Sequence, residues 1–305
     1  MIAIVGPTAC GKTSLAASLA ADIGGEVISG DSRQVYRRMD IGTGKDLDDY
    51  RVGGSQVAYH LIDIAEPGSK YNLFQYQRDF VAAYDDIRQR GAVPILCGGS
   101  GLYIEAVLRG YRLAPVAENK ALRESLAGKT LAELTAMLAE IKRRRGGALH
   151  NTTDVDTAQR AIRAIEIEMG SAGNIIVDDA AARPVDALVV GIAIGRDERR
   201  ARITARLRQR LEHGMVDEVR GLLASGIEAE ALTYYGLEYK YVTEYVVGGI
   251  TYEEMFSRLE TAIHQFAKRQ MTWFRGMERR GVAIHWLDFA LPTERKISEI
   301  KRLWR

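Results

Sequence analysis

The sequence predicts an α/β fold in which a doubly wound parallel sheet carries a small helical insertion domain and a helical C-terminal region. Short apolar runs alternate with helical patterns through the first 110 residues, and the first run leads directly into a glycine-rich loop. A stretch without strand character follows, and an apolar run returns at residue 187. This alternation is typical of parallel sheets, whose ligands bind beyond the carboxyl ends of the strands.

The composition is that of an ordinary globular protein. The chain has 305 residues, of which 47% are hydrophobic and 27% charged, with a formal net charge of +2. No leader pattern and no long apolar run is present, so we expect neither secretion nor a membrane span. The two cysteines, Cys10 and Cys97, are too few for a zinc site and are interpreted as reduced thiols of a cytoplasmic protein.

The first third of the chain is expected to alternate between strands and helices. The expected strands are 2–5, 26–29, 60–64 (a short or edge strand) and 93–97. The expected helices begin at Ser14 and cover 74–90, where Gly91 ends the pattern, and 102–108.

The pattern changes at residue 113. We predict a first core part at 1–112, a helical insertion domain at 113–152 and a second core part at 153–305 with the C-terminal helices. The expected helices are 120–126 and 131–145 in the insertion, and then 156–169 and 253–280; the expected strand is 187–194.

The glycine-rich loop matches the P-loop pattern G-x-x-x-x-G-K-[ST]. It lies between a strand and a helix, as the pattern requires. Its amides and the helix N-terminus would bind a di- or triphosphate, the Lys12 ammonium would add a cation, and the Thr13 hydroxyl would bind Mg²⁺. The phosphate-binding residues are Gly6, Pro7, Thr8, Ala9, Cys10, Gly11, Lys12 and Thr13.

The metal-binding acid of a nucleotide hydrolase is harder to find. The runs 93–97 and 187–194 both end before glycine, and only Leu61-Ile62-Asp63 qualifies weakly as an apolar strand ending in an acid. The sequence therefore predicts a phosphate-binding loop without evident machinery for attack on a γ-phosphate.

Five blocks in order carry a family resemblance. Residues 29–45 read SGDSRQVYRRMDIGTGK and resemble the DS-x-Q-x-Y-x-x-MDIGTAK block of the tRNA dimethylallyltransferases, also called tRNA isopentenyltransferases. The other blocks are HLID at 60–63, GGSGLY at 98–103, QRAIRAIE at 159–166 and AKRQMTWFR at 267–275. The resemblance runs from residue 2 to about residue 275, which is most of the chain.

The resemblance implies a prenyl transfer. In this family the loop grips the pyrophosphate of dimethylallyl diphosphate, and the dimethylallyl group moves to N6 of adenine 37 of tRNA, beside the anticodon. No γ-phosphate is cleaved, so the missing acid is expected. The implied partners are dimethylallyl diphosphate, the tRNA anticodon stem-loop and Mg²⁺, with no membrane and with a monomeric protein.

Asp31 is the candidate base that accepts the proton of the adenine amine, although a carboxylate of a turn or helix cap would look the same. Lys12, Thr13 with Mg²⁺ and, by resemblance, Arg269 would stabilise the departing pyrophosphate. The Ser100 hydroxyl would donate to the leaving oxygen, or satisfy a tight Gly-Gly turn. Lys45 is expected near the phosphates, with a surface lysine as the alternative.

The resemblance also implies residues that contact tRNA. Trp273 is expected to stack on a base or to pack in the core. The basic clusters are either solvated helix faces or contacts to the tRNA backbone. The implied tRNA-binding residues are Asp31, Ser32, Arg33, Gln34, Ser100, Arg123, Gln159, Arg160, Ala161, Ile162, Arg163 and Trp273.

One departure and two alternatives stand beside this interpretation. The family usually has Gly-Tyr followed by Arg or Lys and Gln or Glu where this chain has GLEYK at 236–240, which puts a tRNA contact there in doubt. The same chemistry on a free adenine nucleotide is one alternative, and a small-molecule P-loop kinase is the other.

Overall fold

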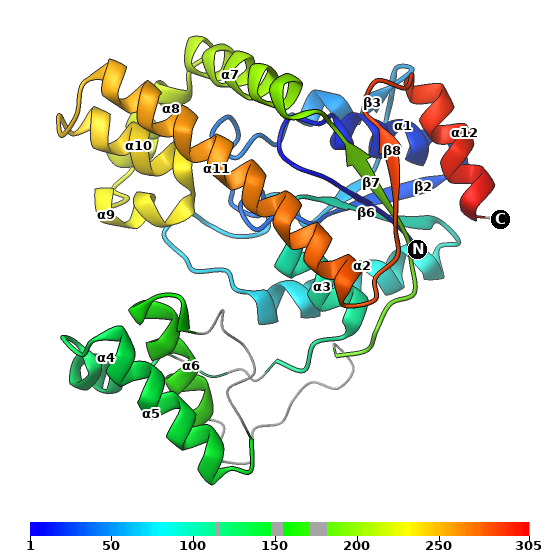
Figure 1. Cartoon of the computed structure of the whole chain (residues 1–305). Helices are drawn as coiled ribbons and strands as arrows, with labels where there is room; N and C mark the ends of the chain where they lie inside the picture. Colours follow the sequence, from blue (N-terminus) through cyan, green and yellow to red (C-terminus); the bar gives the residue numbers. More distant parts are fainter. Residues whose placement is uncertain (114–115, 117, 148–154, 171–181, 305) are drawn as a thin grey trace. The chain divides into compact units, whose positions relative to one another are not determined.

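A computed structural model describes residues 1–305 except 114–115, 117, 148–154, 171–181 and 305. The chain forms two compact units, one of residues 1–110 with 183–305 and one of residues 111–182. They are called the core unit and the helical unit below, and each is described by itself (Figure 1).

The core unit contains a parallel sheet of six strands in the order β5-β2-β6-β1-β7-β8. The doubly wound parallel sheet predicted from the sequence is therefore confirmed. The strands are β1 (Ile2–Val5), β2 (Gly25–Ser29), β5 (Tyr59–His60), β6 (Val93–Gly98), β7 (Leu188–Ala193) and β8 (Ile284–Asp288). β1 lies between β6 and β7 and is wholly buried, which explains its uninterrupted apolar sequence.

Two strands of the six-stranded sheet differ from the sequence-based expectations. β8 was missed, because the region after residue 196 was expected to be largely helical; it is a five-residue edge strand beside β7, too short for a strong periodic signal. β5 is a short edge strand as predicted, but it ends at His60, before the expected end at residue 64. Leu61 and Asp63 have φ values of 61° and 58°, which are incompatible with a continuing strand.

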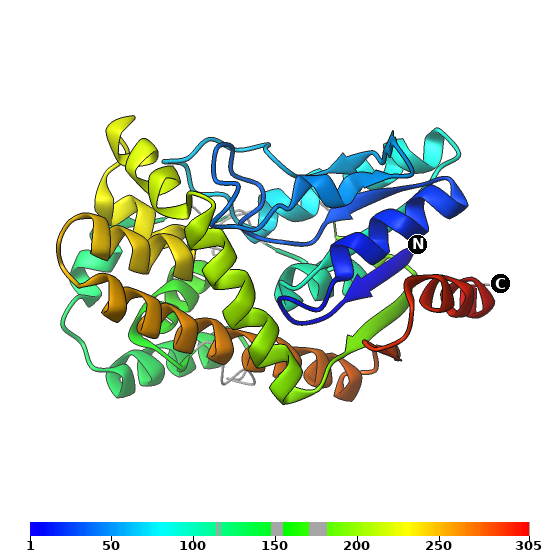
Figure 2. The ribbon, with the colours of Figure 1, turned by 90° about the horizontal axis from the view of Figure 1, so that it is seen from above.

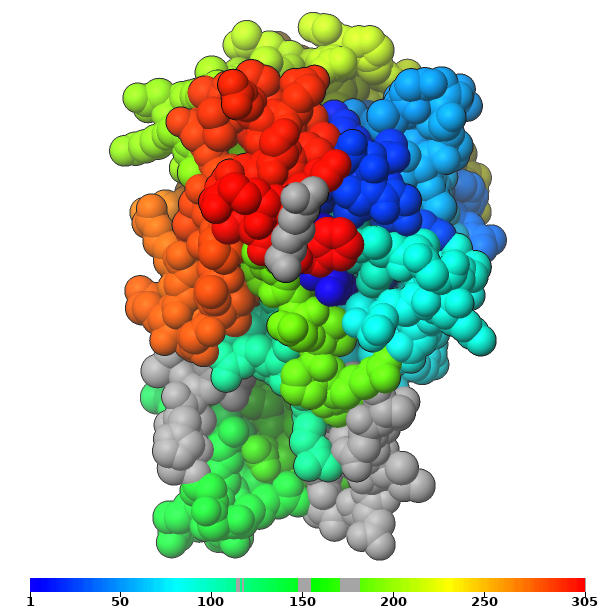
Figure 3. All heavy atoms as spheres, turned by 90° about the vertical axis from the view of Figure 1, so that its right-hand side faces the viewer, coloured from blue at the N-terminus to red at the C-terminus, as the bar shows by residue number. Residues whose placement is uncertain are grey.

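Helices cover both faces of the sheet, and alternate strand residues point to each. Ile2 and Ile4 share a buried cluster with residues of α1 (Lys12–Ile23) and α12 (Thr293–Trp304). Ala3 and Val5 face the other cluster, with residues of α2 (Leu73–Gln89), α3 (Gly101–Arg109) and α11 (Tyr252–Arg279). In Figure 3 the red atoms of α12 lie against the blue atoms of the N-terminal segment, and α12 contacts α1.

The C-terminal half of the core unit is mainly helical, as predicted. It contains α7 (Arg196–Glu212), α8 (Met215–Ala224), α9 (Ala229–Leu232), the 3-10 turn η3 (Thr233–Tyr235) and α10 (Leu237–Val246), followed by α11. A capping box between Thr251 and Glu254 starts α11. Near its end, the buried Glu105 of α3 accepts two hydrogen bonds of 2.6 Å from Arg280.

The segment between β2 and α2 contains a short 3-10 helix, η1 (Leu47–Tyr50), and a two-stranded hairpin of β3 (Arg51–Val52) and β4 (Ser55–Gln56). η1 packs against α1, next to the phosphate loop. Cys10 and Cys97 are buried free thiols. Among the described residues, no helix is long and apolar enough to cross a membrane.

The helical unit contains α4 (Lys120–Leu126), α5 (Leu131–Arg144) and α6 (Ala158–Gly170). Its small core consists of Leu126, Leu134, Leu138, Ala161 and Ile165. Because the last two belong to α6, this helix packs with the insertion rather than with the core part to which the sequence analysis assigned it. The unit accordingly ends at residue 182, while the predicted boundary at 152 lies outside the described residues.

Candidate active site

The phosphate loop connects β1 to α1 as predicted. Ala9 and Gly11 have φ values of 63° and 73°, and this left-handed backbone turns successive amides toward one point. The Lys12 ammonium donates to the carbonyl of Pro7 at 3.1 Å, so the lysine lies over its own loop. Such a loop, with a helix N-terminus behind it, is suited to a phosphate group.

Asp31 and Ser100 lie beside this loop at the same edge of the sheet. Val5 is opposite Gly98 and Ser29 is opposite Cys97, so the segments after β1, β2 and β6 start side by side. A Cβ atom at Gly98 would lie 2.3 Å from the carbonyl oxygen of Gly30, and this close approach requires glycine. The predicted catalytic groups are thus brought together by strand register.

Hydrogen bonds connect these segments. The Ser32 amide donates to the Ser100 hydroxyl at 3.1 Å, and the Arg33 amide donates to Oδ1 of Asp31 at 2.9 Å. The Ser100 hydroxyl therefore forms a hydrogen bond with the neighbouring loop rather than with its own glycine turn. Asp31 makes the turn contact named as its structural alternative, which occupies one carboxylate oxygen and orients the other.

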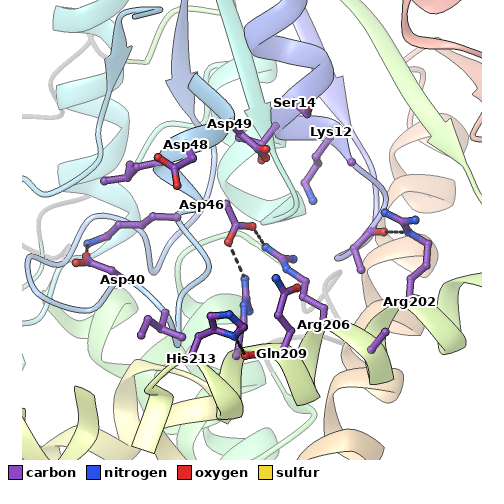
Figure 4. A pocket seen from close by; sticks show the side chains of 18 residues that line it. Lys12, Ser14, Asp40, Asp46, Asp48, Asp49, Arg202, Arg206, Gln209 and His213 are labelled. Atoms are coloured by element: carbon purple, nitrogen blue, oxygen red, sulfur yellow. Dashed lines mark hydrogen bonds and ion pairs between the residues drawn. The ribbon is translucent and has the colours of Figure 1, made fainter. Parts of the chain in front are cut away.

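A cavity of about 780 Å³ opens at the phosphate loop. Its walls come from the loop and α1, from residues 40–49, and from α7. Figure 4 shows Lys12 pointing into the cavity, with Arg206 reaching in from α7 on the facing side. The cavity is large enough for a diphosphate with a short organic group. Asp31 is not part of its lining.

α7 contributes a stripe of arginines that the sequence analysis did not assign to the site. Arg202 donates to the carbonyl of Ala9 at 3.0 Å, and Arg206 forms an ion pair with Asp46. Arg210 lies 3.6 Å from the same carboxylate. The spacing of four residues places all three on one face of the helix. Figure 2 shows α7, in yellow-green, beside the phosphate loop at the start of α1. This spacing of arginines was the signal in the sequence that could have identified the stripe.

Carboxylates line the other wall of the cavity. Burial raises the pKa of Asp49, and the neighbouring Asp46 adds to the shift. No group of three metal-binding side chains occurs in the part of the chain that the structure describes. Mg²⁺ does not need one, because it binds one or two protein oxygens and fills its shell with water and phosphate oxygens. Thr13 and Asp49, which line one cavity, fit such a site.

Lys45 is buried, which contradicts the alternative of a surface lysine. Its side chain lines the cavity, but its ammonium donates to the carbonyl of Tyr36 at 2.7 Å and pairs with Asp40 and Asp63. The pair with Lys45 also engages the weak candidate for a metal-binding acid, Asp63, away from the phosphate loop. Lys45 therefore holds the segment before η1 in place.

α11 touches both glycine loops through Gln270, which the sequence analysis did not single out. Its amide oxygen accepts from the Thr8 amide at 2.8 Å, and its amide nitrogen donates to the Gly99 carbonyl at 3.0 Å. Gln270 is buried, and the AKRQMTWFR block alone does not reveal that burial. Trp273 is half-buried and packs against Gly101, while Arg269 is exposed and lies 6.0 Å from the Phe266 ring centre.

The predicted tRNA residues of the helical unit differ in exposure. Arg123 and Arg163 both bond the buried carboxylate of Glu166, at 2.7 Å and 3.1 Å. Arg160 is exposed beside Asp156, and Gln159 is exposed. Ala161 is buried in the core of the unit and Ile162 is half-buried, so Ala161 presents no side chain to a partner.

The departure at GLEYK has a structural role. Glu218 on α8 accepts the amides of Asp40, Ile41 and Gly42 at 2.7, 2.7 and 3.0 Å. The Tyr239 hydroxyl donates to the same carboxylate at 2.6 Å, and its ring lies against Gly42. Tyr239 therefore fixes the MDIG segment. The sequence analysis left this position unassigned.

Comparisons with known proteins identify relatives along the whole chain. A family model described as IPP transferase matches residues 34–277, and one described as isopentenyl transferase matches residues 1–59. A protein named tRNA dimethylallyltransferase 2, from Bacteroides fragilis, is 61% identical over 302 residues, covering 99% of this chain and 97% of the relative. The protein named tRNA dimethylallyltransferase 1 from Parabacteroides distasonis is 60% identical, with shares of 99% and 97%.

Solved structures agree with these relatives. The crystal structure of the full-length tRNA isopentenylpyrophosphate transferase from Bacillus halodurans matches with a TM-score of 0.70 and 33% identity, over 99% of this chain and 94% of that one. A eukaryotic dimethylallyltransferase, described as acting on tRNA, matches with a TM-score of 0.77 at 21% identity, over 99% of this chain and 79% of that one, and supports the fold.

Proposed function

The chain belongs to the IPP transferase family, and on that premise we propose that it transfers a dimethylallyl group from dimethylallyl diphosphate to N6 of adenine 37 in tRNA. The observation that carries this proposal is the register of β1, β2 and β6, which places Asp31 and Ser100 beside the phosphate loop. A site for leaving diphosphate and a carboxylate base are then neighbours at one edge of the sheet.

The donor's diphosphate would occupy the cavity at the phosphate loop. Negative charge grows on the bridging oxygen as its bond to carbon breaks, and groups that stabilise this charge accelerate the reaction. The loop amides and Lys12 supply positive groups on one side, and Arg206 supplies another from α7. The Ser100 hydroxyl is proposed to donate to the leaving oxygen.

The acceptor is an exocyclic amine, which is a poor nucleophile until it is positioned and deprotonated. In the proposed reaction N6 of adenine bonds to C1 of the dimethylallyl group, the C1–O bond to diphosphate breaks, and one N6 proton passes to Asp31. The half-buried Asp31 is oriented for this role by the Arg33 amide. An adenine within an anticodon loop must be extruded to reach it.

Mg²⁺ is proposed to bind with the diphosphate, where it would neutralise part of the oxygen charge. The Thr13 hydroxyl and the Asp49 carboxylate would hold it. Exposed basic residues such as Arg160 are proposed to contact the tRNA backbone. We propose that a cytoplasmic monomer carries out the reaction.

A transfer assay tests the proposal. Purified protein is incubated with Mg²⁺, labelled dimethylallyl diphosphate and an unmodified anticodon stem-loop, and parallel reactions contain AMP or a stem-loop with guanine in place of adenine 37. We expect label in the adenine stem-loop alone. Label in AMP without label in RNA would replace the proposal by prenylation of a free nucleotide.

A Lys12→Ala variant supplies the matching control for the donor site. Removing one preorganised positive group from a charged leaving group costs about 10²- to 10³-fold in rate. We expect that loss in rate for Lys12→Ala. Its stem-loop affinity should stay within about 2-fold of wild type, because a contact to the donor alone does not contribute to the free energy of RNA binding. Full activity of this variant would contradict the assignment of the loop to the diphosphate.

A further inference from the structure

An exposed aromatic ring packs against Arg33, two residues after Asp31, without a role in the chemistry above. Tyr234 of η3 is 42% exposed, and the guanidinium carbon of Arg33 lies 4.9 Å from the centre of its ring. The stem of Arg33 also approaches Gly236, within about 4 Å of a Cβ atom placed there. These two side chains, Arg33 and Tyr234, are called the Arg33–Tyr234 stack.

The neighbouring residue holds the stack in place. The Tyr235 hydroxyl accepts from the Gly68 amide at 2.6 Å and donates to the Ser69 carbonyl at 3.0 Å. The ring of Tyr235 meets the buried ring of Tyr36 edge-on, with centres 4.6 Å apart. η3 is thereby tied to the loop before α2. The exposed ring of Tyr234 therefore sits on a fixed support, and ordering it on binding costs little entropy.

The stack adjoins the proposed catalytic carboxylate. The amide of Arg33 donates to Asp31, so the two residues belong to one turn. Burial raises the pKa of the Tyr103 hydroxyl, and Arg33, Tyr234 and Asp31 lie close enough to influence it as well. These groups therefore lie around the position where the acceptor amine would meet Asp31.

We infer that the Arg33–Tyr234 stack binds an unpaired base next to the acceptor adenine. This inference rests on the proposed function. A base has a π-face that stacks on an exposed tyrosine whatever its sequence, and the adjacent guanidinium attracts both the ring and the phosphate beside it. When an adenine leaves the anticodon loop to reach Asp31, the neighbouring bases lose a stacking partner. The Arg33–Tyr234 stack takes the place of that partner.

Alanine substitution measures the contribution. Stacking of a base on an aromatic side chain corresponds to about a 5- to 150-fold change in affinity. We expect Tyr234→Ala to weaken binding of an anticodon stem-loop within that range and Tyr234→Phe to bind as wild type. Tyr252→Ala is the matched control, because Tyr252 is also 42% exposed but rests on Tyr245. It should bind as wild type.

Abasic stem-loops show whether the lost contact is to a base. Each nucleotide flanking adenine 37 is replaced in turn by an abasic residue, and affinities are measured for wild type and Tyr234→Ala. We expect one position at which removing the base abolishes the difference between the two proteins. Equal differences at all positions, or an effect of Tyr234→Ala no larger than that of Tyr252→Ala, would overturn the inference.

Donor kinetics separate the remaining outcomes. If Tyr234→Ala raises KM for dimethylallyl diphosphate and leaves stem-loop affinity unchanged, the ring contacts the prenyl group and the inference is wrong. If wild type prenylates the stem-loop and Tyr234→Ala binds the stem-loop with unchanged affinity, the inference fails and the proposed function stands. If wild type transfers no prenyl group to RNA, the proposed function itself fails.

Discussion

Asp31 has a structural contact that is compatible with the chemical role proposed for it. Its Oδ1 accepts the Arg33 amide, which is the ordinary behaviour of an aspartate in a turn. That bond holds the carboxylate at the end of β2, beside Ser32 and Ser100. A turn residue can therefore also serve as the proposed base, and the two interpretations of the sequence are compatible.

We predict that Asp31→Asn separates these roles. Asparagine keeps an oxygen that accepts the Arg33 amide, but it cannot take a proton at neutral pH. Turnover should fall about 10²- to 10⁴-fold, with stem-loop Kd within about 2-fold of wild type. Single-turnover kinetics and RNA binding measure the two effects. Weaker binding with unchanged turnover would show that Asp31 serves recognition alone.

Helix α11 connects the distant parts of the site. Its 28 residues run from the capping box at Thr251 past the loops after β1 and β6. Gln270 contacts both loops with the two ends of one amide. A buried amide with both ends bonded stabilises its surroundings more than an apolar residue there, because Thr8 and Gly99 would otherwise be left unpaired.

We predict that Gln270→Leu loosens the phosphate loop. KM for dimethylallyl diphosphate should rise about 10-fold, corresponding to about 1.4 kcal/mol for the lost hydrogen bond to Thr8 of the phosphate loop, and stem-loop Kd should stay within about 2-fold. Steady-state kinetics against donor concentration measure this. Gln265→Leu, at an exposed position of the same helix, should behave as wild type. A fall in kcat at unchanged donor KM would contradict the positioning role.

Across the molecule, the two units depend on different interactions. The core unit rests on a sheet covered by two large apolar clusters. The helical unit has a small core, and a buried carboxylate, Glu166, connects its elements through Arg123, Arg163 and the Asn119 amide. Burial alone would raise the pKa of Glu166, but these hydrogen bonds outweigh it and lower the pKa to about 2.

We predict that acid destabilises the helical unit through Glu166. A carboxyl whose folded pKa is depressed contributes stability above its unfolded pKa of about 4.5, and this is lost as the pH falls toward 2. At pH 7 Glu166→Gln should lower the unit's free energy of unfolding by about 3 kcal/mol, and the difference should close over that window.

Urea titrations at stepped pH, followed by NMR signals of Leu134 and Leu138, measure this in the full chain. Glu140→Gln is the matched control, because Glu140 pairs with Arg143 and Arg144 in the same unit and its side chain is 40% exposed. It should change stability little at any pH. A difference for Glu166→Gln that persists below pH 2 would show that packing, rather than ionisation, explains its effect.

Local patterns were sufficient for most of the fold. The apolar run of β1, the P-loop pattern and the alternation of strands and helices predicted the sheet, because these signals lie within a few residues of each other. β8 was missed because a five-residue edge strand has little periodicity. α6 was predicted as a helix but assigned to the wrong unit, because its partners Leu134 and Leu138 are distant in sequence.

The groups proposed to take part in the chemistry were all named from the chain, the glycine loop by its own pattern and Asp31 and Ser100 through the family resemblance. The residues that surround these groups could not be read from the sequence. Arg206 lines the cavity, Gln270 bonds two loops and Tyr234 contacts Arg33 because strand register and helix packing bring remote segments together. A motif indicates which atoms can react. Long-range contacts leave no local pattern in the sequence, and they determine which residues surround those atoms.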